Sequence, residues 1–295
     1  MTGAAGKLGR AVVAELASSG WDVLAVDRVR GADVAAGGAV GAAGGGSVSW
    51  VVTDLTDYGQ VVSVIGGTVD ERGPRADAVV HLAAVPAPGL VPNSAVFANN
   101  AVATWNVFEA ARVCGVQRVV WASSETVLGL PFEVPPPYAP VDEEYWPRPE
   151  STYSLTKVLE EEMARQMCRW DPERTMVGLR FSNVMDVEDY AAFPAFDADP
   201  LARKWNLWGY IDARDGAQAV RRGLEWDGRG CEVFIIANAD TVMSRSSASL
   251  MAEVFPGVEV RRELGEHETL LGIDKARRVL GYEPQHSWRD HATPR

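Results

Sequence analysis

Tyr153 and Lys157 stand four positions apart, the spacing that puts two side chains on one face of a helix. A tyrosine hydroxyl has a pKa of about 10 and is a weak base at neutral pH. A neighbouring ammonium favours the phenolate and moves that pKa towards the range of a useful general base. Such pairs are also common on helix surfaces, so the meaning of this one depends on what lies near it.

Two hydroxyls precede the pair in the chain. Ser123 and Ser124 follow the apolar run Val119–Ala122, which we expect to be a buried strand. Ligands of open parallel sheets bind at the carboxyl ends of the strands, so Ser124 could contact a substrate oxygen there. Serines that merely end a strand are the alternative. A catalytic role for Ser124 becomes the better interpretation only in combination with Tyr153, Lys157 and a cofactor site.

A glycine-rich turn at the start of the chain predicts that cofactor site. Gly3, Gly6 and Gly9 are spaced three apart and run into an apolar pattern with helical spacing. Glycine lets the backbone turn sharply and approach phosphates, and a helix N-terminus offers free N–H groups and a positive dipole end. The turn therefore indicates a site for a dinucleotide pyrophosphate.

Asp27 lies 18 residues beyond Gly9, where a second strand ends. A carboxylate there can accept hydrogen bonds from both adenosine ribose hydroxyls and would repel a 2′-phosphate, which favours NAD over NADP. Arg28 and Arg30 argue the other way, because a guanidinium could hold that phosphate.

The elements that must position these residues alternate along the first two thirds of the chain. Apolar runs without alternation suit strands buried on both faces, and the βαβ order predicts an α/β fold with a doubly wound parallel sheet. The expected strands are 23–27, 48–53, 78–82, 118–123 and 176–181, and the expected helices are 9–19, 58–66, 95–114, 153–170 and 215–225.

The remaining segments are less regular. The glycine- and alanine-rich stretch 31–46 predicts a loop or a weak helix, and the proline-rich stretch 131–149 predicts an extended loop over a site. In the last quarter we expect a strand at 233–237, a helix from about Ser246 and a closing helix at 273–280.

A phosphate turn of this kind normally follows a buried strand, and Met1 stands where that strand would end. Four or five buried apolar residues contribute roughly 6–15 kcal/mol, about the stability of a whole domain. We therefore hypothesise that a short strand belongs upstream of Met1.

Composition limits the classes of function. The net charge of −12 disfavours nucleic acid as a partner, and no apolar run has the length of a membrane span. Three widely spaced cysteines predict reduced thiols in a cytoplasmic protein. The four histidines lack ligand spacing, so no metal site is expected.

Taken together, the motifs resemble those of extended short-chain dehydrogenases/reductases of the NAD-dependent epimerase/dehydratase family. The matching segments are Thr2-Gly3-x2-Gly6-x2-Gly9, Asp27, Asp54-Leu55, His81-Leu82-Ala83-Ala84, Asn100, Ser124, Tyr153-x3-Lys157, Arg180-x2-Asn183-Val184, the corner 210–215 and the closing segment 273–284. The chain departs from the family pattern at Ala103, where a glycine is usual.

The resemblance implies a Rossmann domain at 1–182 that takes NAD, with 209–238 returning to it, and a smaller, mostly substrate-binding part at 183–295. It implies a homodimer through helices 95–114 and 153–170. The implied catalytic residues are Ser124, Tyr153 and Lys157. The implied cofactor contacts are Gly3, Gly6, Lys7, Leu8, Gly9, Asp27, Arg28, Asp54, Leu55, Leu82, Ala83, Ala84, Asn100, Tyr153 and Lys157, and candidate substrate contacts are Glu125, Thr126, Asn183 and Arg203.

Several reactions remain open within that family. Dehydration needs both an acid and a base, and Thr126 stands where the family's dehydratases carry the second carboxylate. Only 28 residues separate Asn183 from Asp212, and Arg203 and Lys204 are their only basic residues, which suits a smaller sugar better than a nucleotide diphosphate. Trp205 and Trp208 could stack on that sugar or pack in the core. We therefore expect hydride removal from a sugar or sugar derivative, with a nucleotide-sugar 4-epimerase or a non-catalytic dinucleotide-binding regulator as alternatives.

Overall fold

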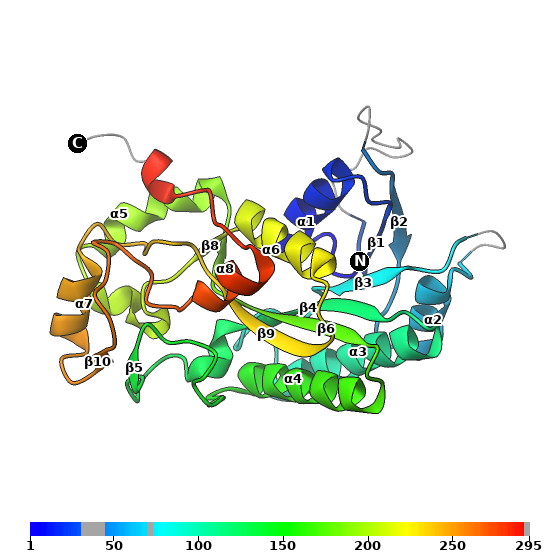
Figure 1. Cartoon of the computed structure of the whole chain (residues 1–295), viewed down its shortest axis with the longest axis horizontal. Helices are drawn as coiled ribbons and strands as arrows, with labels where there is room; N and C mark the ends of the chain where they lie inside the picture. The colour runs from blue at the N-terminus through cyan, green and yellow to red at the C-terminus, as the bar shows by residue number, and fades with distance from the viewer. Residues whose placement is uncertain (31–44, 70–72, 292–295) are drawn as a thin grey trace.

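The computed structural model describes residues 1–30, 45–69 and 73–291 (Figure 1). The stretch expected to form a loop or a weak helix therefore lies, up to residue 44, outside the described residues.

A parallel sheet forms the larger lobe. Thr2 bridges Val26 and His81 in parallel, which joins two strands on one side to four on the other and gives the order β2-β1-Thr2-β3-β4-β6-β9. The strands are β1 (Val23–Asp27), β2 (Val48–Val52), β3 (Ala78–His81), β4 (Arg118–Ser124), β6 (Thr175–Phe181) and β9 (Gly230–Ile236). Two halves that diverge from the centre confirm the predicted doubly wound Rossmann sheet.

Met1 and Thr2 lie at the centre of this sheet, between β1 and β3. The Val26 amide donates to the Met1 carbonyl at 2.8 Å, and the Thr2 amide donates to the Val80 carbonyl at 2.8 Å. The glycine turn follows at once, so its backbone begins at the carboxyl edge of the sheet.

Helices cover both faces of the sheet (Figure 1). α1 (Lys7–Ser18) and α6 (Ala213–Glu225) pack together on one face, and α2 (Tyr58–Gly66), α3 (Asn93–Val113) and α4 (Thr152–Trp170) cover the other. Successive strand residues point to opposite faces, so Val120 joins one apolar core and Val119 the other. Each predicted helix and strand of this lobe is present, with bounds that differ by no more than a few residues.

A smaller lobe lies beyond the carboxyl ends of the strands (Figure 1). Its short elements are β5 (Tyr138–Ala139), β7 (Val184–Met185), η2 (Val187–Ala192), α5 (Phe193–Phe196), η3 (Pro200–Asn206), β8 (Ile211–Asp212), α7 (Ser247–Val254), β10 (Glu259–Val260) and η4 (Trp288–His291). Two further short elements pack on the larger lobe, namely η1 (Glu125–Leu128) on α4 and β6, and α8 (Asp274–Leu280) on β9 and α6. The proline-rich stretch 131–149 is mostly irregular as expected, but it also contains β5, which pairs with β10.

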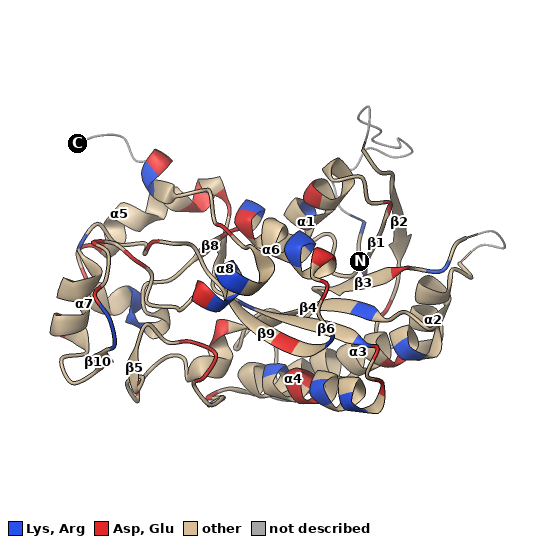
Figure 2. Ribbon diagram, in the orientation of Figure 1, with Lys and Arg blue, Asp and Glu red and all other residues tan. Residues whose placement is uncertain are grey.

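Charge of both signs is spread over the two lobes, with acidic and basic residues interleaved along α4 and α6 (Figure 2). Among the helices of the described residues, none combines the length and the hydropathy needed to cross a membrane.

Candidate active site

A pocket of about 1150 Å³ opens at the carboxyl ends of the strands. It exceeds the ~300–1,000 Å³ typical of one small ligand, so it has room for a cofactor and a second molecule. The predicted residues that line it are Gly3, Gly6, Lys7, Leu8, Gly9, Asp27, Arg28, Leu55, Leu82, Ala83, Ala84, Ser124, Glu125, Thr126, Tyr153, Lys157 and Asn183.

The three glycines of the turn have different reasons to be glycine. Gly3 has a φ of +72°, and a Cβ there would lie 2.7 Å from the Ala83 nitrogen. A Cβ on Gly9 would lie 2.0 Å from the Gly3 oxygen. At Gly6 a Cβ would meet nothing in the protein closer than 3.4 Å, although the residue lines the pocket. Packing therefore explains Gly3 and Gly9, whereas Gly6 fits a ligand that approaches the backbone closely.

Asp27 stands at the adjoining edge of the pocket. Its Oδ2 accepts from the Ala5 amide at 3.0 Å, and its Oδ1 accepts from the Arg28 amide at 2.7 Å. The carboxylate is thus fixed against the glycine turn and is half-buried. The contact of Asp27 with a ribose stays a prediction.

Two acidic residues of the smaller lobe reach the first turns of α1. Lys7 forms an ion pair with Asp189, and an Arg10 guanidinium nitrogen lies 3.6 Å from an Asp186 carboxylate oxygen. These pairs tie the segment around η2 to the glycine turn.

Tyr153 and Lys157 project from the first turns of α4. A capping box fixes the start of this helix: the Ser151 hydroxyl accepts from the Ser154 amide, and the Ser154 hydroxyl accepts from the Ser151 amide. Both functional side chains are buried, and the Lys157 nitrogen lies 5.8 Å from the centre of the Tyr153 ring. The expected shared face of the pair is present.

Burial changes the expected electrostatics of this pair. It raises the pKa of Tyr153 above the usual value, although Lys157 and the Ser124 hydroxyl both act to lower it. We expected the ammonium to bring the phenol into the range of a base, and in the structure without ligands desolvation outweighs it. The cause is the low polarity around the ring, which disfavours the phenolate.

Ser124 ends β4 beside this pair. Its Oγ accepts from the Thr126 amide at 3.2 Å and from the Thr126 hydroxyl at 3.0 Å. With both bonds accepted, the proton of the Ser124 hydroxyl is free to be donated. Thr126 therefore orients the serine as a donor.

Glu125 is buried beside Ser124 and connects the two lobes. Its Oε2 accepts from the Ser182 hydroxyl at 2.6 Å, and its Oε1 accepts from the Asn206 side-chain amide at 3.3 Å. Burial raises the pKa of this carboxyl to about 7, against the lowering effect of those bonds and of Arg203. The carboxylate is at the pocket wall, but both of its oxygens already have protein partners.

Three predicted residues do not line the pocket. Asn100 is buried and holds the loop after β3, since its amide bonds both the nitrogen and the carbonyl of Val85. Asp54 is exposed and accepts from Thr56, and Arg203 is buried and donates to the Gly209 carbonyl at 2.9 Å. Direct ligand contacts by these three stay predictions.

The two tryptophans considered for stacking lie in different environments. Trp205 lines the pocket, whereas Trp208 is fully buried and donates from its ring nitrogen to the Pro200 carbonyl at 2.7 Å. Core packing explains Trp208, and Trp205 alone is placed to stack on a ligand.

Sequence reasoning missed Glu160. The Lys157 ammonium donates to its carboxylate at 2.9 Å and to the Ala122 carbonyl at 2.9 Å. The signal was available, because residues three apart on a helix are neighbours and Glu160 follows Lys157 by three.

The histidine nearest the site is neutral. His81 hydrogen-bonds Thr2 at 2.7 Å and Thr104 at 3.1 Å, and burial, with Lys157 adding to it, lowers its pKa to about 3. Over the part of the chain that the structure describes, no group of three or more potential ligands could hold a metal ion.

Comparison with known proteins identifies the family of the chain. The model of the NAD dependent epimerase/dehydratase family matches residues 1–202. UDP-glucose 4-epimerase 2 of Oryza sativa is 30% identical over 218 residues, 72% of this chain and 50% of that protein. UDP-glucose 4-epimerase of Drosophila melanogaster is 31% identical over 223 residues, 72% and 59% of the two chains. The chain thus spans about half the length of the curated relatives it matches.

Solved structures extend the likeness over nearly the whole chain. A UDP-galactose 4-epimerase is 26% identical, with a TM-score of 0.65 over 97% of this chain and 92% of that one. A glucuronic acid dehydrogenase from Chromohalobacter salexigens has a TM-score of 0.64 over 98% and 86%, and at 22% identity it speaks for the fold alone.

Proposed function

The chain belongs to the NAD-dependent epimerase/dehydratase family, and from that membership we propose that it is an NAD-dependent oxidoreductase or epimerase acting on a sugar or sugar derivative. One observation carries the proposal: Ser124, Tyr153 and Lys157 line the same pocket as the glycine turn and Asp27. A binding-only regulator would have no use for a buried tyrosine and lysine arranged in this way.

Each wall of the pocket has a role in this proposal. The glycine turn and the N-terminus of α1 hold the pyrophosphate, Asp27 holds the adenosine ribose, and Lys157 holds the nicotinamide ribose. NAD, when bound, supplies the hydride acceptor. Tyr153 takes the proton of the substrate hydroxyl, and Ser124 donates a hydrogen bond to the same oxygen and fixes its approach.

The smaller lobe supports a substrate without a diphosphate. Arg203 points at the Gly209 carbonyl, the Lys204 nitrogen lies 3.7 Å from a Glu133 carboxylate oxygen, and neither lines the pocket. These are the only basic residues between Asn183 and Asp212. We therefore propose a sugar or uronate dehydrogenase, with Glu125, Thr126, Asn183 and Trp205 at the substrate side. A nucleotide-sugar 4-epimerase is the second candidate, because the curated relatives carry that name.

The test is a panel of aldoses, uronates and nucleotide sugars, each incubated with the protein and NAD. Accumulation of NADH with a free sugar or uronate supports the dehydrogenase, and interconversion of sugars without net NADH supports the epimerase. Tight binding of NAD without turnover of any compound would contradict both and favour a regulator.

We also propose the division of the chain into a cofactor part at 1–182 and a substrate part at 183–295, with 209–238 returning to the first. β9 pairs with β6 and α6 packs on α1, which supports that return. We propose a cytoplasmic location, supported by three free cysteines.

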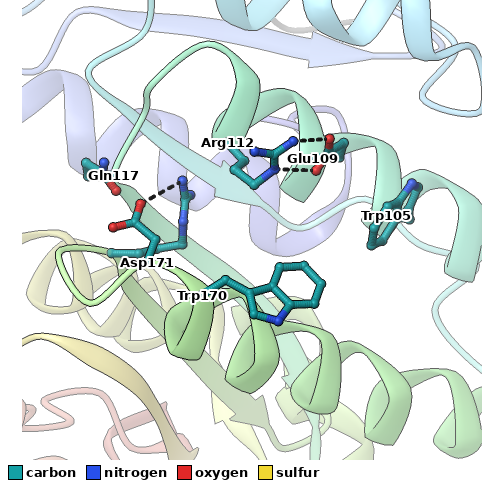
Figure 3. A pocket seen from close by; sticks show the side chains of 7 residues that line it. Trp105, Glu109, Arg112, Gln117, Trp170 and Asp171 are labelled. Carbon is teal, nitrogen blue, oxygen red and sulfur yellow. Dashed lines mark hydrogen bonds and ion pairs between the residues drawn. The ribbon is translucent and has the colours of Figure 1, made fainter.

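For the assembly we propose a homodimer across α3 and α4. Figure 3 shows Trp105 of α3 and Trp170 of α4 at a hollow of about 400 Å³ between the two helices. Further apolar side chains of this face are exposed, namely Phe97, Val102, Val113, Leu155 and Leu159. Such a cluster favours a partner surface over water.

Light scattering after size exclusion tests the dimer. We expect the substitution Trp105→Glu to convert a dimer to a monomer, because it replaces an exposed apolar side chain of this face with a charge. Trp146→Glu is the matched control, since Trp146 is 85% exposed and lies outside α3 and α4. A wild-type protein that is monomeric at all concentrations would contradict the proposal.

A further inference from the structure

Two consecutive carboxylates on α4 are fully buried and have different partners. Glu161 accepts from Arg180 through both oxygens at 2.8 Å, and from the Ser123 hydroxyl at 2.7 Å. Glu160 accepts from Lys157 at 2.9 Å. Glu161 is therefore bound to the sheet, whereas Glu160 is bound to a residue of the reaction itself.

The contact between Glu160 and Lys157 lies out of reach of water. Their side chains are 0% and 3% exposed. One carboxylate oxygen of Glu160, Oε1, has no hydrogen-bond partner among the described residues. A carboxylate in such a place is costly unless a cation compensates it, so its presence beside Lys157 calls for an explanation in the chemistry of that lysine.

We propose that Glu160 is a positioning residue for the reaction: its carboxylate keeps Lys157 charged in the dry site and limits how strongly that charge acts on Tyr153. This inference rests on the proposed function, because it assumes that Tyr153 is the base. It gives the Glu160 carboxylate a role in the reaction, beyond any role in the stability of the fold.

The charged groups around the pair come from three elements. Tyr153 and Glu161 lie on α4 itself, and Glu125 acts on Tyr153 from η1. His81 faces Lys157 from β3 and is neutral. Glu160 is thus the carboxylate with the strongest effect on Lys157, and Glu161 adds to it.

These neighbours set the direction of the effect. Burial lowers the pKa of Lys157, but Glu160 and the groups that assist it outweigh burial, so the pKa lies above the usual value. Glu160 also acts to raise the pKa of Tyr153. Burial raises the pKa of Glu160 itself, and Lys157 opposes that rise. Removal of the Glu160 charge should therefore lower the pKa of both Lys157 and Tyr153.

NMR of the lysine side chains tests this without turnover. The chain has only four lysines, so ¹³Cε-lysine labelling gives few signals, and Lys157→Met identifies the one that matters. In the wild type we expect Lys157 to stay protonated past the ordinary midpoint of about 10.4. In Glu160→Gln we expect its midpoint to fall by about one pH unit or more. Glu162→Gln, an exposed site on the same helix, should leave it unchanged.

Two results would overturn the proposal. One is a wild-type midpoint below about 10.4, which needs no variant and holds even if Glu160→Gln does not fold. The other is an equal midpoint in the wild type and in folded Glu160→Gln. Neither depends on a substrate, so failure of the proposed function would be seen separately.

If turnover is found, the pH profile of kcat/KM provides a second readout. We expect both limbs to move to lower pH in Glu160→Gln, the acid limb with Tyr153 and the alkaline limb with Lys157. A merely structural role would reduce activity equally at every pH and leave both midpoints in place, which would contradict the inference.

Discussion

The glycine turn and α4 form different walls of one pocket, and the two walls present different kinds of chemical group. At the turn the protein presents backbone: a Cβ on Gly6 would meet no protein atom closer than 3.4 Å, and Asp27 is held by two amides. At α4 and η1 it presents the buried ionisable side chains of Glu125, Tyr153 and Lys157, and Lys157 is bound in turn to the buried Glu160.

This difference suggests that one wall binds the cofactor and the other carries out the reaction. Backbone amides carry no proton that titrates near neutral pH, so the first wall should set affinity for the cofactor with little dependence on pH. Buried ionisable groups have free energies that depend strongly on protonation, so the second wall should set rate and pH response. Substitutions confined to one wall test this contrast.

Tyr153→Phe should have the largest effect. It removes the group that we propose accepts the proton, and kcat should fall about 10²- to 10⁴-fold. The affinity for NAD, measured by calorimetric titration, should change less than about twofold, because the turn is untouched. Wild-type turnover in Tyr153→Phe would show that Tyr153 is not the base.

Glu125→Gln should change the dependence of stability on pH. The folded protein raises the pKa of this carboxyl from 4.5 to about 7, so its stabilising effect is complete below pH 4.5 and is lost as pH rises through 7. Gln keeps the shape without the charge. The variant should equal the wild type near pH 4.5 and be more stable at pH 8 by about 3 kcal/mol.

Calorimetric melting at both pH values measures that difference. An equal difference between wild type and variant at pH 4.5 and pH 8 would show that burial of the charge has no cost at this position.

Gly6→Asp should weaken NAD binding about tenfold or more, a loss of at least ~1.4 kcal/mol, because it puts a negative charge where we propose that the pyrophosphate binds. Aspartate caps helices well, so the melting temperature should stay close to that of the wild type. Gly257→Asp is the matched control, since Gly257 has open space around it. Unchanged affinity in Gly6→Asp would place the cofactor elsewhere.

Trp205→Ala should have the smallest effect. The substitution removes a stacking interaction with the sugar of ~0.5–1.5 kcal/mol. KM for the sugar should therefore rise about two- to tenfold, and the affinity for NAD should stay unchanged. A larger effect on NAD than on the sugar would assign this side chain to the other wall.

The two walls also differ in how far the sequence predicts them. Spacing alone places Gly3, Gly6, Gly9 and Asp27, because a strand, a turn and a helix are local structures. The same holds for α2, which is capped by Asp57 and ends at Gly67 in the left-handed region with φ of 75°.

The charged wall is predictable only in part: spacing places Tyr153 and Lys157 on one helix face, whereas other buried carboxylates beside them have partners far apart in the chain. Glu161 meets Arg180 across 19 positions, and Glu125 meets Ser182 across 57. Periodicity carries no information about such pairs. Trp208 is a similar case, because Leu207 and Trp208 adopt positive φ angles of 54° and 56° at the end of η3, although neither residue is a glycine.

The most direct test is the transient absorbance of reduced nicotinamide when the NAD-loaded protein is mixed with a sugar substrate, followed in the wild type and in Tyr153→Phe under the same conditions. This signal is produced by a dehydrogenase and by an epimerase alike. We expect it to rise in the wild type and to remain near the baseline in Tyr153→Phe, which still binds NAD. A rise at the same rate in both proteins would contradict proton transfer to Tyr153.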